Sequence, residues 1–87
     1  MSEAFNPTEV QRIANEGKKV YESKKLEYEP HQNGKFLAID VDSKDVYLAE
    51  DGAQAVELAR KAHPNKIFYL VKIGFETAET IARLFAR

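Results

Sequence analysis

The chain contains no cysteine and no long hydrophobic run. Without cysteine it forms neither a disulfide nor a thiolate metal site, so nothing favours an oxidising compartment. Its longest wholly apolar run, Ile67–Val71, is far too short to span a bilayer. The first residues lack a positively charged leader with an apolar stretch behind it. We therefore expect a cytoplasmic protein without a membrane segment.

The chain also has almost no net charge, with 13 Lys and Arg against 14 Asp and Glu. It thus lacks the long-range positive field with which most nucleic-acid-binding proteins attract phosphates. Charged residues are 31% and hydrophobic residues 44% of the sequence, a balance typical of folded domains. At this length we expect a single domain over residues 1–87, with a core unit over residues 29–74.

Residues 6–9, NPTE, carry the signature of a helix start. Asparagine caps free amides, proline suits the first helical position, and Glu9 can reach back to the cap. Apolar residues then recur at spacings of three and four, which predicts an amphipathic helix from Pro7 to about Lys25. Gly17 lies on the apolar stripe at a cost of about 1 kcal/mol in helix propensity. This cost predicts close contact with another element.

Two β-like runs, residues 36–41 and 46–49, follow a connector at 27–35 that contains a proline and an Asn-Gly pair. The Asp-Ser-Lys-Asp sequence at 42–45 favours a tight turn, so the two runs should form a hairpin. The first run is apolar on both faces and should be covered from both sides.

A second helix is predicted to begin after Asp51, whose side chain can cap it. It should end at His63, because the following proline pushes that residue out of helical geometry. Residues 66–73, KIFYLVKI, give the strongest strand signal. A short final helix, starting at 76 or 77, is expected to end at Arg87. Its apolar stripe consists of Ala78, Ile81, Ala82 and Phe85.

The order α-β-β-α-β-α indicates an α+β fold. The helix after the second strand is long enough for a crossover, so the third strand can lie beside the first and antiparallel to it. We predict a three-stranded antiparallel sheet of order 2-1-3 with the helices packed on it. This order leaves the third strand with a free edge, which natural proteins rarely leave bare.

We expect either that the first or the last helix covers this edge or that a second copy of the chain pairs with it. The C-terminal stripe has little core left to join in so small a domain, and we therefore expect a homodimer. The residues assigned to the protein interface are Phe68, Leu70, Ile81, Leu84 and Phe85.

Asp40, Asp42 and Asp45 come nearest to a metal motif, because D-x-D opens many calcium loops. The later positions of such a loop require glycine and glutamate, and here they hold Asp45 and Asp51. Turn formation and helix capping are therefore the favoured interpretation. A weak surface cation site at Asp40 and Asp42 is the alternative. No metal ligand and no cofactor are assigned.

No spacing links the two histidines, His31 and His63, to each other or to a serine. The chain has no glycine-rich phosphate loop, no zinc spacing and no nucleophile elbow. We assign no catalytic residue and expect a protein that is not an enzyme. An enzyme built on Asp40, Asp42 and His31 is the least favoured alternative.

The only concentrated basic stretch lies on the first helix and consists of Lys18, Lys19, Lys24 and Lys25 together with Arg12. Nearby glutamates balance it, so a solvated helix face explains it equally well. As an alternative, these four lysines form the contact surface of a small nucleic-acid-binding regulator.

The string EPHQNGKFLAIDVDSKDVYLAEDGAQAVELARKAHPNKIFYLVKIG, residues 29–74, resembles a family of small prokaryotic domains of unknown activity. Shared features are a Gly-Lys-aromatic strand, an Ile-Asp-x-Asp hairpin, an acidic helix start and a closing Val-Lys-Ile-Gly strand. The chain is more distantly similar to antitoxin domains of partial ribonuclease H fold. The acidic quartet of ribonuclease H has no match here, so the resemblance implies no nuclease and transfers no site residue.

The resemblance implies a short stand-alone protein, in some cases encoded in a two-gene arrangement of the toxin–antitoxin kind. Together with the absence of catalytic motifs, it favours a non-enzymatic binding module. We expect an antitoxin-like or adaptor protein that acts through self-association and contact with a partner protein.

Overall fold

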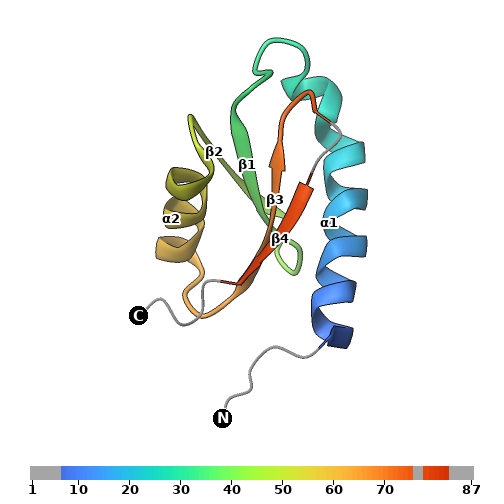
Figure 1. Ribbon diagram of the computed structural model, residues 1–87, viewed down its shortest axis with the longest axis vertical. Coiled ribbons are helices and arrows are strands. Elements are labelled where there is room, and N and C mark those ends of the chain that lie inside the picture. Colours follow the sequence, from blue (N-terminus) through green and yellow to red (C-terminus); the bar gives the residue numbers. More distant parts are fainter. Residues whose placement is uncertain (1–6, 76–77, 83–87) are drawn as a thin grey trace.

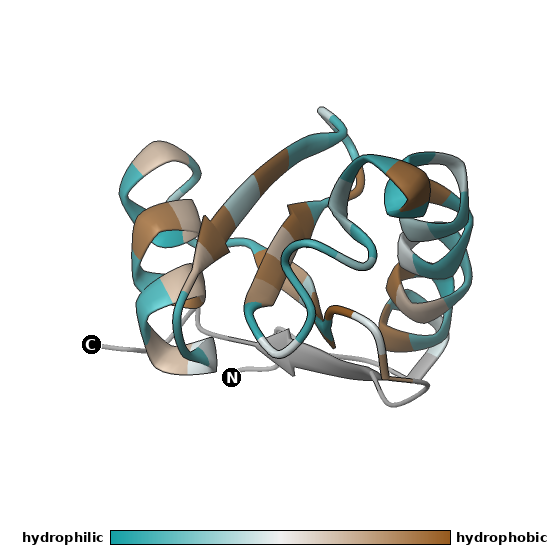
Figure 2. Cartoon of the chain, turned by 90° about the horizontal axis from the view of Figure 1, so that it is seen from above, coloured by the Kyte–Doolittle hydropathy of each residue, from teal (hydrophilic) through white to brown (hydrophobic). Residues whose placement is uncertain are grey.

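A computed structural model of the chain describes residues 7–75 and 78–82. In chain order the elements are α1 (Pro7–Tyr28), β1 (Phe36–Asp40), β2 (Asp45–Ala49), α2 (Gly52–Ala62), β3 (Ile67–Lys72) and β4 (Ala78–Ala82). All pairings in the sheet are antiparallel, and the strand order is β2-β1-β3-β4. Figure 1 and Figure 2 show α1 and α2 on opposite sides of this sheet, which makes three layers. The α+β class and the order β2-β1-β3 are confirmed.

β1 lies in the centre of the sheet, and its side chains alternate between two cores. Leu37 and Ile39 join the core under α1, and Ala38 joins the core under α2. All three are 0% exposed, which confirms the predicted coverage from both sides. In Figure 2 the strands, with their hydrophobic segments, lie between the two helices.

α1 packs over β1, β3 and β4, and it lies close to the sheet at Gly17. A Cβ atom at Gly17 would lie 2.2 Å from Cγ of Tyr69 on β3, so only glycine fits beneath this ring. The predicted close contact is confirmed. The helix begins at Pro7 as predicted and continues to Tyr28, beyond the expected end at Lys25. Asn6, the expected cap, lies outside the described residues.

α2 begins as the sequence predicts. Asp51 adopts extended backbone geometry, and its side chain accepts a hydrogen bond of 2.8 Å from the amide of Gln54. The helix then buries one side against the sheet through Ala55, Val56 and Ala59. This capping role for Asp51 accounts for one of the acidic residues that could have been taken for a site.

The predicted C-terminal helix is wrong where the structure describes it. Residues 78–82 form β4, which pairs with β3 so that Ala82 lies opposite Ile67 and Ala78 opposite Val71. The edge of β3 would otherwise be unpaired, and β4 gains backbone hydrogen bonds by pairing with it. A helix of about two turns with a short apolar stripe would gain less, so pairing with β3 overrides the helical spacing of the apolar residues. The remainder of the expected helix, at 76–77 and 83–87, lies outside the described residues.

Two further features follow from these elements. The edge of β3 that motivated the dimer is occupied by β4 of the same chain, so the sheet now ends at β2 and at β4. Among the described helices, none combines the length and apolar character needed to cross a membrane.

Candidate functional site: a polar cluster and an open sheet edge

A cluster of charged side chains lies where β1 ends. The strand order brings the β1–β2 turn, residues 41–44, to the same end of the sheet as the α2–β3 connection, residues 63–66. Asp40 closes β1 at this end and is only 1% exposed. A buried carboxylate costs free energy unless cations and hydrogen-bond donors surround it, so its neighbours determine what the cluster is.

Asp40 is held by residues from both connections. Ser43 donates a hydrogen bond of 2.8 Å to Oδ2 of Asp40, and Nδ1 of His63 lies 3.3 Å from the same oxygen. Nζ of Lys66 lies 3.5 Å from Oδ1, which accepts no hydrogen bond from any residue in the described ranges. The lysine therefore compensates the charge of Oδ1 through an ion pair without a directed hydrogen bond.

Lys66 also joins Asp40 to the exposed rim of the cluster. Its ammonium donates to Oδ2 of Asp42 at 2.5 Å, and Nη1 of Arg12 on α1 lies 3.3 Å from the other oxygen of Asp42. The hydrogen bond from Lys66 lowers the pKa of Asp42, and the same bond raises the pKa of Lys66. The pKa of Arg12 is raised, first by its hydrogen bond with Glu9. Each partner keeps the other charged, so α1 is tied to both connections.

His63 bridges two carboxylates. Its Nε2 lies 3.1 Å from Oδ2 of Asp45, the first residue of β2, while its Nδ1 faces Asp40. The ring of Tyr47 meets the imidazole edge-on, with the centroids 6.1 Å apart. Burial raises the pKa of the Tyr47 hydroxyl. His63 thus fixes the beginning of β2 to the end of α2.

This geometry is that of a structural lock. The Ser43 hydroxyl donates to Asp40 and accepts from the amide of Asp45, so it is not paired with His63 as an activated nucleophile would be. Lys66 occupies the space between Asp40 and Asp42 that the cation-site alternative needed. Within the part of the chain that the structure describes, no group of three or more His, Asp or Glu side chains is placed to hold a metal ion.

The structure separates the residues of the catalytic alternative. His31 lies exposed in the turns that precede β1, whereas Asp40 ends that strand. Sequence reasoning instead missed His63 and Lys66. The signal was available, because the order 2-1-3 already places the connection after the second helix beside the hairpin turn. A basic residue in that connection could therefore have been matched to the buried Asp40.

The four lysines of the nucleic-acid alternative do not form one surface. Each residue of an α-helix is rotated by about 100° from the one before it. Lys19 and Lys24 are five residues apart, so their directions differ by about 140°. Lys19 lies 3.8 Å from Glu16, and Lys25 lies 3.7 Å from Glu22. Acidic neighbours therefore offset the positive potential along α1.

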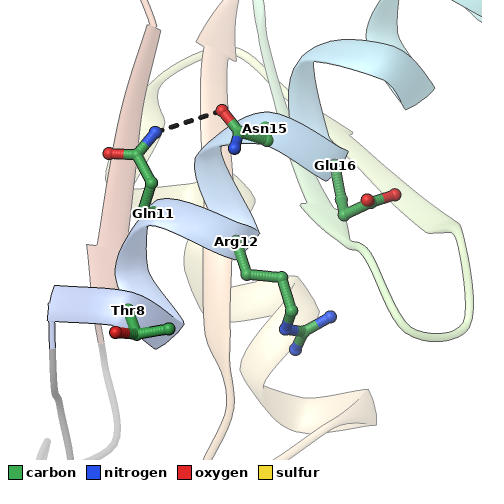
Figure 3. A pocket seen from close by; sticks show the side chains of 5 residues that line it. All are labelled: Thr8, Gln11, Arg12, Asn15 and Glu16. Carbon is green, nitrogen blue, oxygen red and sulfur yellow. Dashed lines mark hydrogen bonds between the residues drawn. The ribbon is translucent and has the colours of Figure 1, made fainter.

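A shallow hollow on the outer face of α1 is mostly lined by uncharged polar side chains. Figure 3 shows that Gln11 points toward Asn15, to which it donates a hydrogen bond of 3.1 Å, while Arg12 extends away from this pair. The lining residues are Thr8, Gln11, Arg12, Asn15 and Glu16. Arg12 is already engaged by Glu9 and Asp42, so the hollow offers no free cation.

Two of the five residues assigned to an interface, Phe68 and Leu70, are buried within the chain. Phe68 is 0% exposed and Leu70 is 9% exposed, and both belong to the core beneath α2. They would reach a partner only if this core opened. Ile81 lies opposite Phe68 in the register of β4. Leu84 and Phe85 lie outside the described residues.

The open edge at β2 carries apolar side chains that the sequence reasoning did not identify as a surface. Leu48 is 36% exposed, and it lies opposite Leu37, on the α1 side of the sheet. Val46 shares that side and is half-buried. The strand, DVYLA, has no proline and no charge after its first residue. Edge strands are commonly protected by such residues, so β2 is available for pairing.

Comparisons of the chain with known protein families, with curated proteins and with solved structures found no match.

Proposed function

We propose that the protein is a small non-enzymatic binding module, an antitoxin-like or adaptor protein that acts through protein–protein contacts and self-association. The observation that carries this proposal is the open edge of β2, where Val46, Tyr47 and Leu48 form an uncharged strand at the end of the sheet. A partner strand added there would gain main-chain hydrogen bonds, and its side chains would alternate between the two faces of the sheet.

The polar cluster supports this proposal by making β2 rigid. His63 contacts Asp45 at the beginning of β2, and Ser43 bonds the amide of the same residue. An edge strand that is already ordered loses little further entropy when a second strand binds to it. The cluster is thus the support of the binding edge, and it takes no part in chemistry.

The test is co-purification of partners from the native host with wild type and the Leu48→Lys variant. A lysine on an edge strand opposes strand pairing, so we expect partner recovery to fall at least several-fold. The matched control is Leu58→Lys, because Leu58 is 44% exposed on α2 and is not part of the edge strand. Both variants should keep the far-UV circular dichroism and melting temperature of wild type.

Equal recovery with wild type and Leu48→Lys would contradict the proposal. So would retention of DNA or RNA at low salt that is lost when Lys18 and Lys25 are replaced by glutamine, because that result favours the nucleic-acid alternative.

A further inference from the structure

We infer that two copies of the chain pair through β2 in antiparallel orientation, with Tyr47 on the two-fold axis. The inference rests on the proposed function, because it uses the same edge, and it names a second copy of this chain as the occupant. The two sheets would then join into one continuous eight-stranded sheet, with the α1 helices on one face and the α2 helices on the other.

Symmetry restricts the registers that such a pair can adopt. A two-fold axis perpendicular to the sheet places the α1 faces of both copies on one side of the joined sheet and the α2 faces on the other. Directly opposed residues of antiparallel strands have side chains on one face. A residue of β2 must therefore lie opposite itself, which leaves Val46, Tyr47 or Leu48 near the middle of the strand.

The register centred on Tyr47 is complementary in both shape and charge. It places Val46 opposite Leu48 of the second copy, twice by symmetry, so the exposed apolar side chains of the α1 face cover each other. It also places Lys44, just before the strand, opposite Glu50, just after it. Both residues are exposed. Oε2 of Glu50 lies 3.3 Å from Nζ of Lys35 in its own chain, so Lys44 of the second copy would join or replace this partner in an ion pair at each end of the interface.

The two neighbouring registers lack this pairing of Val46 with Leu48 and of Lys44 with Glu50. With Val46 on the axis, the exposed Leu48 of each copy lies opposite Lys44 and no longer opposite Val46, and with Leu48 on the axis, Asp45 lies opposite Asp51. Like charges directly opposed across strands are destabilising. The sequence of β2 and its flanks therefore selects the Tyr47 register.

The interface is small, since β2 contains five residues. Interfaces that bury less than about 1,200 Å² in total are commonly weak, so we expect dissociation in the micromolar range. The oligomeric state is best measured by analytical ultracentrifugation over a range of protein concentrations.

Charge reversal tests the register. Lys44→Glu alone and Glu50→Lys alone each place like charges at both ends of their own homodimer, so each should raise the dissociation constant about 5-fold or more. A mixture of these two variants restores opposite charges at both ends and should form heterodimers preferentially. Lys61→Glu, on exposed α2, is the control and should change nothing.

A disulfide across the axis provides an independent test, because the chain has no cysteine of its own. Opposed Cα atoms in antiparallel strands lie about 4.5–5.5 Å apart, within the range that a disulfide bridges. Tyr47→Cys should therefore form a covalent dimer on mild oxidation. Ala49→Cys should not, because its two copies would lie about 14 Å apart.

A wild type that stays monomeric at high concentration overturns the inference, as does a dimer that ignores the charge reversals or crosslinks better through Ala49→Cys. Pairing through β4 would give a dimer that ignores the charge reversals at β2. If partner recovery still depends on Leu48 in that case, the inference alone fails. If recovery is also indifferent to Leu48→Lys, the proposed function fails with it.

Discussion

At Gly17, helix propensity and packing act in opposite directions. Alanine there would gain about 1 kcal/mol of helix propensity, but its Cβ would lie 2.2 Å from Cγ of Tyr69. Because the helix and the strand are both buried at this point, the clash should dominate, and Gly17→Ala should lower the free energy of unfolding by about 2 kcal/mol. Urea denaturation measures this, with exposed Asn15→Ala as the control for propensity.

If Gly17→Ala were instead more stable than wild type, α1 would not lie as close to β3 as the structure places it. Partial recovery in a Gly17→Ala/Tyr69→Leu double variant would assign the loss to this ring.

Tyr21 gives the fold a dependence on alkaline pH. Burial raises the pKa of its hydroxyl to about 12, and the hydrogen bond of 2.5 Å that it donates to Glu29 adds to the effect. The folded state therefore holds this proton more tightly than the unfolded state. The contribution to stability is fully present below the unfolded pKa of about 10 and is lost as the pH rises toward 12.

A pKa shift of this size corresponds to roughly 2–3 kcal/mol of the free energy of unfolding. Tyr21→Phe should abolish that part of the pH dependence while wild type retains it, as chemical denaturation at pH values from 9 to about 11 measures. Parallel loss of stability in the two proteins would show that Tyr21 does not titrate in this environment.

Among the elements, the two connections at the end of β1 depend on each other through Lys66. Lys66→Met removes the ammonium group near buried Asp40 and should lower the free energy of unfolding by about 2 kcal/mol, since the remaining charge is buried without it. Exposed Lys61→Met should have little effect. Asp40→Asn in the Lys66→Met background should recover part of the loss, because it removes the uncompensated charge.

A double-mutant cycle measures this coupling. If the effects of Asp40→Asn and Lys66→Met simply add, the two side chains do not interact and the lock is not the support of β2.

The elements differ in how far the sequence predicts them. The start of α1, the cap of α2 at Asp51 and the order β2-β1-β3 follow from local chemistry and from the apolar pattern of β1, and the structure agrees. β4 does not follow, because Ala78, Ile81 and Ala82 satisfy helical spacing and the pairing that decides their structure is with distant β3. Likewise, two of the partners of Asp40, His63 and Lys66, come from a connection more than twenty residues away.

At the scale of the whole molecule, helices cover the sheet on both faces and β4 of the same chain pairs with β3, while β2 forms one of the two edges and carries no charge after Asp45. The charged side chains near β2 hold the β1–β2 turn, and we propose that Lys44 and Glu50 select the register of pairing. The central claim is that this edge is where the protein makes contact with another chain.

The most direct test of this claim is amide hydrogen exchange of residues 45–49, monitored by NMR. The exchange rates are compared as the protein concentration is raised and as a co-purified partner is added. The outward-facing amides of an unpaired edge exchange quickly, and pairing protects them. We predict that protection in β2 rises in alternate residues while β4 is unchanged. Rapid exchange in β2 under every condition, or protection gained only in β4, would contradict the account.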